Sequence, residues 1–414
     1  MIVPLPALEA YRQDLAAAPG RASFGNADPL WLAVAQAIAR LADLPHDERR
    51  PLISGLADAL AGWSADVDTD PTVDALPAAL GACLDDDMDD RTIAVLLRWA
   101  ATVERAGALN LTYSALAALR QLIPATANSR RALGLILAQQ GRIAREVGDV
   151  VTAADLYAQA EEAGHASGDA EVTVRAVLGQ GVLAVIRGNY PDARIHFGRA
   201  LGVAKAHGLQ VHASAAHHGL LRAALAAGDL DAALRHGWDA FKHAAGDRHR
   251  QAELLTNLGE ICLLIARPAA ALRAYRTALR FTSLATIRLG ALGGAVIAAA
   301  RLGDRRALDE LSAETEQTIS RVAEPYEHAV TLVELAEAFA IFGDIGRRDA
   351  YRTRALQLAE ERGFYEVVHR AESMPRGSTT TTEARRPPSL SDGAVGVLRA
   401  IESLDPSASA AASI

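Results

Sequence analysis

The sequence predicts an all-α protein made of consecutive antiparallel helix pairs. Half of its 414 residues are apolar and only 5% are aromatic, and the excess of alanine, leucine and arginine favours helices over strands. A turn centred on glycine recurs about every 40 residues along most of the chain, which is typical of repeat architectures. A β-rich fold is therefore excluded, and a helical repeat protein is expected.

The repeated turn is usually Gly-Asp or Gly-Asn, and it separates two apolar segments of helical length. Glycine provides the positive φ needed just past a helix end, and the following Asp or Asn caps the next helix. Each unit is thus predicted to be a helix, a turn and a second helix. The turns lie at Gly107, Gly148-Asp149, Gly188-Asn189, Gly228-Asp229, Gly303-Asp304 and Gly343-Asp344, with Ala266-Arg267-Pro268 in the one slot that lacks glycine.

Small and aromatic residues recur at fixed positions within these units. In one unit Gly181 lies seven residues before the turn, Ala193 five residues after it, and Phe197 four residues further on. This order resembles the tetratricopeptide repeat, most clearly from about residue 129 to residue 284. One unit departs from it, because Leu221 replaces the glycine and Gly237 replaces the aromatic residue. The resemblance implies a right-handed superhelical solenoid of antiparallel helix pairs, with the first helix of each pair lining a concave groove.

The chain is expected to fall into five segments. Residues 128–373 form the tetratricopeptide-like repeats, and residues 28–127 form divergent helical hairpins that cap the solenoid. Residues 1–27 precede them as an N-terminal segment. Residues 374–391 are rich in Pro, Thr and Arg and are predicted to be a flexible linker, followed by a short amphipathic helix and a disordered tail in residues 392–414. Within the hairpins, Pro77 is expected to kink or split its helix.

Charge and cysteine content narrow the compartment and the class of partner. The net charge of −8 has the wrong sign for a protein that wraps nucleic acid, so no direct nucleic-acid binding is expected. Cys83 and Cys262 match no disulfide or zinc pattern, which fits a reducing cytosol. No signal peptide is evident, and charged residues interrupt every long apolar run, so a cytoplasmic protein without a membrane span is expected. The oligomeric state is left open.

No motif for catalysis, a metal or a cofactor stands out. Glycine-rich phosphate loops, nucleophile elbows and Cys-His arrangements are missing from the sequence, so no catalytic residue and no cofactor are predicted. The stretch from Asp66 to Asp70 resembles the start of a calcium loop. Pro71 and Pro77 stand where that loop requires glycine and a bidentate glutamate, so no metal is predicted either.

The histidine-rich stretch and the low aromatic content bear on two further possibilities, a histidine site and a toroid enzyme. Eight of the twelve histidines lie between His196 and His249, and we expect them to be solvated residues on helix surfaces. An α/α-toroid enzyme shares hairpin repeats of this length and stays as an alternative. Its sugar or terpene sites need aromatic walls, for which 19 aromatic residues in the whole chain supply few candidates.

The repeat resemblance predicts where a partner binds, because outward positions of each first helix face the groove. Apolar residues at Leu135, Leu178, Val182 and Val185 fill other groove positions, so an amphipathic helix is an alternative to an extended peptide. Asn257 is expected to hold a peptide backbone with its amide. The predicted groove residues, which run from basic to acidic along the chain, are Arg142, Arg145, Arg175, His218, Arg222, Glu253, Thr256, Asn257, Glu260 and Glu337.

The sequence therefore predicts a non-catalytic scaffold or regulatory adaptor that binds a partner protein or peptide in its groove. Similarity to the repeat domains of bacterial regulators implies a regulatory setting. A sensor of a peptide or small ligand in a bacterial regulatory system is the main alternative. For the adaptor, reversing the charge of Arg142 and Arg145 is expected to abolish partner binding without changing helicity.

Overall fold

The computed structural model describes residues 35, 38–41, 44–64, 71–85, 89–105, 109–123, 129–374 and 389–404, in which all regular structure is α-helical. Residue contacts divide the chain into two compact units, Met1–His207 and Gly208–Ile414. The helices of unit 1 are α3 (His46–Ser64), α4 (Pro71–Asp85), α5 (Asp90–Arg105), α6 (Leu109–Leu122), α7 (Arg130–Glu146), α8 (Val150–Ser167), α9 (Ala170–Ile186) and α10 (Tyr190–Ala206). Those of unit 2 are α11 (Gln210–Ala226), α12 (Leu230–His243), α13 (Arg248–Leu264), α14 (Pro268–Phe281), α15 (Ala285–Leu302), α16 (Arg305–Ile319), α17 (Pro325–Phe342), α18 (Ile345–Arg362), α19 (Tyr365–Glu372) and α20 (Asp392–Glu402).

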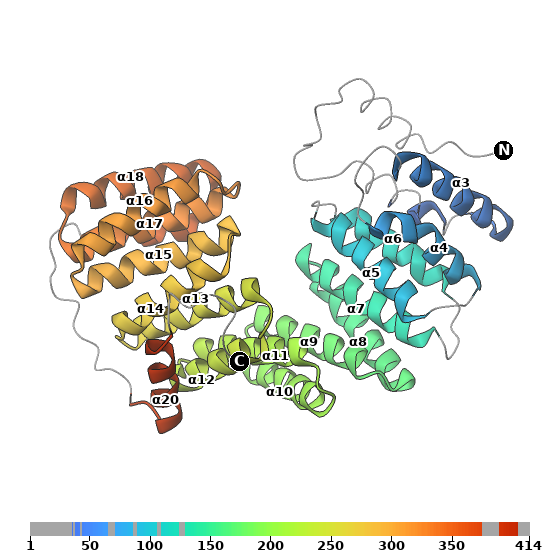
Figure 1. Ribbon diagram of the computed structural model, residues 1–414, viewed down its shortest axis with the longest axis horizontal. Coiled ribbons are helices and arrows are strands. Elements are labelled where there is room, and N and C mark those ends of the chain that lie inside the picture. The colour runs from blue at the N-terminus through green and yellow to red at the C-terminus, as the bar shows by residue number, and fades with distance from the viewer. Residues whose placement is uncertain are drawn as a thin grey trace, which may run out of the picture. The chain divides into compact units, whose positions relative to one another are not determined.

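Consecutive helices pack as antiparallel pairs, for example α7 with α8 in unit 1 and α13 with α14 in unit 2 (Figure 1). This is the all-α, tetratricopeptide-like architecture that the sequence predicts. In unit 2 the first helices of successive pairs also contact one another, since α15 packs against both α13 and α17, and α17 packs against α19. We call the surface formed by α11, α13, α15, α17 and α19 the first-helix face of unit 2.

The repeated turns have the backbone geometry that their sequence predicts. Gly148, Gly188, Gly228, Gly303 and Gly343 all have positive φ values, between 69° and 88°. The Asp or Asn that follows each of them accepts a hydrogen bond from a backbone N–H in the first turn of the next helix. Where glycine is missing, the alanine at the same place takes the left-handed conformation itself, with a φ of 57°. The remaining predicted turn, at residue 107, lies outside the described residues.

The small and aromatic positions pack together inside the units. The ring of Tyr275 lies against Gly259 and is only 2% exposed. In the unit that departs from the pattern, the space over Gly237 is filled by Leu221 and Leu258, each of which would come within 2.8 Å of a Cβ added there. A first-helix leucine thus occupies the room that an aromatic ring fills elsewhere, which explains why the two substitutions occur together.

Helix α15 is the central helix of the unit 2 core. Among the described residues it alone is long and apolar enough to cross a membrane by length and composition. Residues 291–300 are nevertheless all buried within the protein, against α13, α14, α16 and α17. Its apolar composition is therefore explained by burial in the core.

Helix α20 returns along the fold to pack against α12 and α14 (Figure 1). Its apolar side chains, among them Val397, Leu398 and Ile401, are buried there. The backbone N–H of Ser391 donates to Oδ1 of Asp231 at 2.7 Å and fixes the start of the helix. The short amphipathic helix therefore docks on the second helices of two pairs and leaves the first-helix face uncovered by it.

The expectation that Pro77 splits its helix is wrong. Helix α4 runs unbroken from Pro71 to Asp85 with Pro77 inside it. Its buried face, which includes Leu76 and Leu80, packs between α3 and α5, and this packing outweighs the backbone hydrogen bond that the proline removes. The segment that resembles a calcium loop, residues 375–388 of the expected linker, and the tail from residue 405 lie outside the described residues.

Candidate functional site

The basic residues predicted in unit 1 are paired with glutamates on their own helices. On α7, Arg142 and Arg145 both bind Glu146, at 2.8 and 3.2 Å. On α9, Arg175 binds Glu171 at 2.7 Å. The Arg142–Glu146 and Glu171–Arg175 pairs are four residues apart and meet on one face of a helix, and such pairs are worth only about 0.3–0.5 kcal/mol. The structure thus places these arginines at the predicted helices but shows them already paired.

The apolar positions predicted for the groove divide into two kinds. Leu135 is 2% exposed and belongs to the core of unit 1. Leu178, Val182 and Val185 on α9 are half-buried. Only the latter three retain apolar surface that a ligand can contact.

In unit 2, His218 of α11 is held by two residues of α13. Arg250 donates from Nη2 to Nδ1 of His218 at 2.8 Å, and the side-chain amide of Asn257 lies 3.0 Å from Nε2. Burial and the neighbouring Arg250 charge lower the pKa of His218 to about 4, so the ring is neutral at pH 7. A neutral imidazole that accepts at Nδ1 carries its proton on Nε2, and a hydrogen bond from that proton to Asn257 requires the side-chain amide, whose nitrogen lies nearest in the structure, to be turned so that its oxygen accepts.

Two more of the predicted residues lie beside this network. Glu253 accepts a hydrogen bond from Arg250 at 2.6 Å. Arg222, one turn beyond His218 on α11, is exposed and lies close enough for its charge to act on the His218 ring. The α11 end of the first-helix face therefore presents a fixed polar network with a positively charged residue at its edge.

Three glutamates of α13 and α17 gather on the same face, and we call them the carboxylate cluster: Glu260 of α13, with Glu334 and Glu337 of α17. Arg370 of α19 donates two hydrogen bonds to Glu337, both at 2.7 Å. The charges of Glu260, Glu337 and Arg370 all act on Glu334, which shows that the four groups lie together. Two of these residues, Glu260 and Glu337, were predicted from the sequence.

Glu334 has no hydrogen bond or ion pair with any other described residue, although it is half-buried. Its carboxylate lies directly over Gly293 of α15, where an added Cβ would stand 1.8 Å from Oε2. Only glycine leaves room for the carboxylate in this position. Burial is the main cause that raises the pKa of Glu334, to about 8, and the charges of Glu337 and Glu260 raise it further against the opposing effect of Arg370.

Glu260 is the second member of the cluster without a partner among the described residues. Its residue is exposed, and its pKa is raised by the surrounding protein while the charge of Arg370 opposes the shift. The charge of Arg370 therefore acts on all three carboxyl groups, although it forms hydrogen bonds only with Glu337. Although Glu334 is mostly protonated at pH 7, the carboxylates of Glu260 and Glu337 outnumber the single positive charge of Arg370, so the first-helix face of unit 2 changes from positive at α11 to negative at α17.

The histidines differ from the sequence expectation. His217 is only 3% exposed, with its Nδ1 at 3.2 Å from Nδ1 of His236 and its ring stacked on His243 at 5.5 Å between centroids. The expectation of solvated surface residues is wrong for His217, because its position on α11 faces α12 and not the solvent. In the part of the chain that the structure describes, no group of three or more His, Cys, Asp or Glu residues is arranged to hold a metal.

Sequence reasoning missed Glu334, Arg250 and Arg370. A signal for Glu334 was present, because it lies three residues before Glu337 and so shares its helix face. Arg370 lies on α19, beyond the last recognisable repeat turn, and no spacing in the sequence connects it with α17.

Comparison with known proteins agrees on the fold and goes no further. A crystal structure of the apo form of RapI is similar, with a TM-score of 0.51 and 9% identity, covering 81% of this chain and 99% of that one. Aspartyl phosphate phosphatase F from Bacillus subtilis gives a TM-score of 0.46 at 12% identity, covering 85% and 97% of the two chains. No protein-family model and no curated protein matches the sequence. At such identities the likeness concerns the arrangement of helices alone.

Proposed function

We propose that this protein is a non-catalytic regulatory adaptor of the cytoplasm, and that the first-helix face of unit 2 binds a peptide or protein segment with a cationic side chain. The observation that supports this most is the carboxylate of Glu334, which is partly desolvated over Gly293 and has no partner. Placing a carboxylate in such surroundings is costly, and a bound cation repays that cost.

The arrangement of charges also gives the bound segment a direction. A lysine or arginine side chain of the segment pairs with Glu334 and Glu260. An acidic group of the same segment meets Arg222 on α11, beside the His218 that Arg250 and Asn257 of α13 hold in place. Charge complementarity of this kind contributes to specificity and register more than to affinity.

The test is binding of fluorescent pentapeptides with one central arginine to the full chain. Peptides with citrulline in place of arginine keep the shape and remove the charge. We expect arginine peptides to bind better than citrulline peptides, and Glu334→Gln or Glu260→Gln to abolish that preference. Glu162→Gln changes an exposed glutamate of unit 1 and is the matched control. Equal binding of arginine and citrulline peptides would contradict the proposal.

The same assay separates the adaptor from the sensor. Binding of the isolated pentapeptide indicates a receptor for free peptides. Binding only when the arginine is displayed on a folded partner indicates an adaptor. Both forms of the function use the carboxylate cluster, so the glutamine variants report on either.

A further inference from the structure

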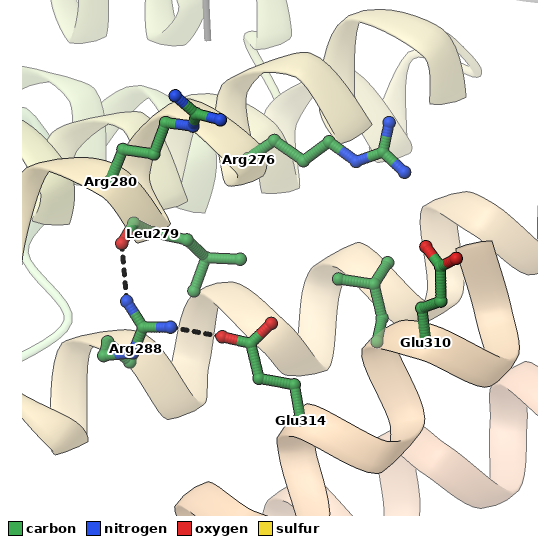
Figure 2. A pocket seen from close by; sticks show the side chains of 7 residues that line it. Arg276, Leu279, Arg280, Arg288, Glu310 and Glu314 are labelled. Carbon is green, nitrogen blue, oxygen red and sulfur yellow. Dashed lines mark hydrogen bonds and ion pairs between the residues drawn. The ribbon is translucent and has the colours of Figure 1, made fainter. Parts of the chain in front are cut away.

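Helices α14, α15 and α16 line an open cleft of about 510 Å³, and no residue of the carboxylate cluster or of α20 is among those that line it. Figure 2 shows Arg276 and Arg280 of α14 along one side of the cleft, with Glu310 and Glu314 of α16 on the opposite side. A volume of this size suits a side chain or a small molecule.

Arg288 of α15 closes one end of the cleft and is fully engaged. It donates from Nη1 to the carbonyl oxygens of Leu279 and Thr282, at 2.5 and 3.2 Å, and from Nη2 to Glu314 (Figure 2). The carbonyl ends of a helix carry partial negative charge, which disfavours anions. Arg288 offsets that charge at the end of α14, and Glu314 is neutralised by the same residue.

The two remaining arginines of the cleft have no partner among the described residues. Arg276 and Arg280 are one turn apart on α14 and both are exposed. Helix α14 contains no acidic residue with which they could pair. On the facing helix α16, Glu310 already has a partner, because Arg306 of the same helix binds it at 2.8 Å. Glu310 therefore does not neutralise an arginine of α14. The cleft therefore has two unbalanced positive charges.

Between the charged sides the cleft is apolar. Leu311 of α16 is 7% exposed and Leu279 is partly buried against the core of unit 2. A ligand that contacts both leucines has an apolar portion next to its charge. This distinguishes the cleft from an evenly charged helix surface, which attracts any counter-ion.

We propose that this cleft binds a phosphate monoester attached to an apolar group. A phosphate monoester has a charge of about −1.5 to −2 at pH 7, which matches two arginines, whereas a single carboxylate matches only one. A guanidinium group can also donate two parallel hydrogen bonds to two oxygens of one phosphate. The phosphate belongs either to a phosphorylated side chain of a partner protein or to a free phosphate ester, and the structure fits their shared chemistry.

The test is calorimetric titration of the full chain with the capped tripeptide leucine-phosphoserine-leucine, its unphosphorylated form, its glutamate form, phenyl phosphate and inorganic phosphate. We expect the phosphorylated tripeptide or phenyl phosphate to bind at least about tenfold more tightly than inorganic phosphate, since the leucines contact the apolar portion. Tighter binding of the tripeptide assigns a phosphorylated partner. Tighter binding of phenyl phosphate assigns a free ester.

Variants connect that binding to the cleft. The pair Arg276→Ala and Arg280→Ala is expected to weaken binding at least about tenfold, and the pair Arg276→Lys and Arg280→Lys to weaken it less, since lysine keeps the charge but not the paired hydrogen bonds. Arg187→Ala with Arg194→Ala removes two exposed arginines of unit 1 and is expected to change nothing. Equal affinity of wild type and the Arg276→Ala, Arg280→Ala variant would overturn the proposal, as would equal binding of the phosphorylated and unphosphorylated tripeptides.

Discussion

The basic residues of unit 1 and the carboxylates of unit 2 all lie on first helices of the repeat, but the former have ion-pair partners and two of the latter do not. Arg142 and Arg145 share Glu146, and Arg175 binds Glu171, with all three pairs on one helix and within 3.2 Å. Glu260 and Glu334 have no such partner, and Glu334 is pressed against a glycine of the next first helix. A charge that is already paired gains little from a ligand, whereas an unpaired and desolvated one gains much. This difference is the reason why we propose unit 2, and not unit 1, as the binding unit.

The largest effect is expected from changing the glycine under Glu334. In Gly293→Ala the new Cβ displaces the Glu334 carboxylate, so the affinity for an arginine pentapeptide should fall about tenfold or more. The protein should stay folded, because the displaced atoms are the end of a flexible side chain and alanine favours the helix by about 1 kcal/mol. Fluorescence polarisation measures the affinity and circular dichroism the fold.

Gly290→Ala is the matched control for that change. It lies one turn earlier on α15, and its added Cβ would meet only a methyl group of Thr256, at 3.9 Å. Binding within about twofold of wild type is expected, because this contact is an ordinary van der Waals distance. If both alanine variants bind the arginine pentapeptide with wild-type affinity, the position of the Glu334 carboxylate does not determine binding, and the proposal is contradicted.

A smaller effect is expected in the dependence of stability on pH. Because the pKa of Glu334 is about 8 in the folded protein and near 4.5 when unfolded, the folded state holds a proton that the unfolded chain has lost between these values. The stability from this group is present below pH 4.5 and is lost as the pH rises through about 8. Glu334→Gln should therefore be more stable than wild type at pH 9, and this advantage should shrink toward pH 5.

Urea unfolding at pH 5 and pH 9 measures this difference. Glu162→Gln removes a carboxylate that is exposed, and its stability should follow wild type at both pH values. A constant difference between Glu334→Gln and wild type at the two pH values would show that Glu334 titrates normally in the folded protein.

The smallest effect is expected for the paired arginines of unit 1. Removing the charges of Arg142 and Arg145 together, as Arg142→Ala and Arg145→Ala, should change the affinity for an arginine pentapeptide by less than about twofold. This revises the sequence-based expectation that these two residues determine binding. A loss comparable to that of Glu334→Gln would restore the basic residues as part of the site and remove the distinction between the two units.

The fold was accessible from the sequence because the repeat leaves local signals. Each glycine turn with its Asp or Asn cap is recognisable without tertiary information, and even Ala266 is found at the expected slot with a φ of 57°. The same repeat spacing places Leu221 on the first helix and Gly237 on the second helix of one pair. Helix α4 shows the limit of such rules, since tertiary packing carries the helix through Pro77.

The site was only partly accessible, because its chemistry depends on contacts between distant residues. The repeat positions located Glu260 and Glu337, yet nothing in their local sequence tells that Arg370 binds Glu337 across 33 residues. The pairing of Arg142 with Glu146 was readable from a spacing of four. The unpaired state of Glu334 was not readable, since it requires knowledge of every side chain on α13, α15 and α19.

The most direct test of the account is the number of protons released when a cationic ligand binds. Isothermal titration of the arginine pentapeptide at pH 7, in two buffers with different ionisation enthalpies, gives this number. Because Glu334 is mostly protonated at that pH and must ionise to pair with the arginine, wild type should release close to one proton per peptide, and Glu334→Gln should release none. Tight binding with no proton release in wild type would contradict the central claim that Glu334 receives the cation.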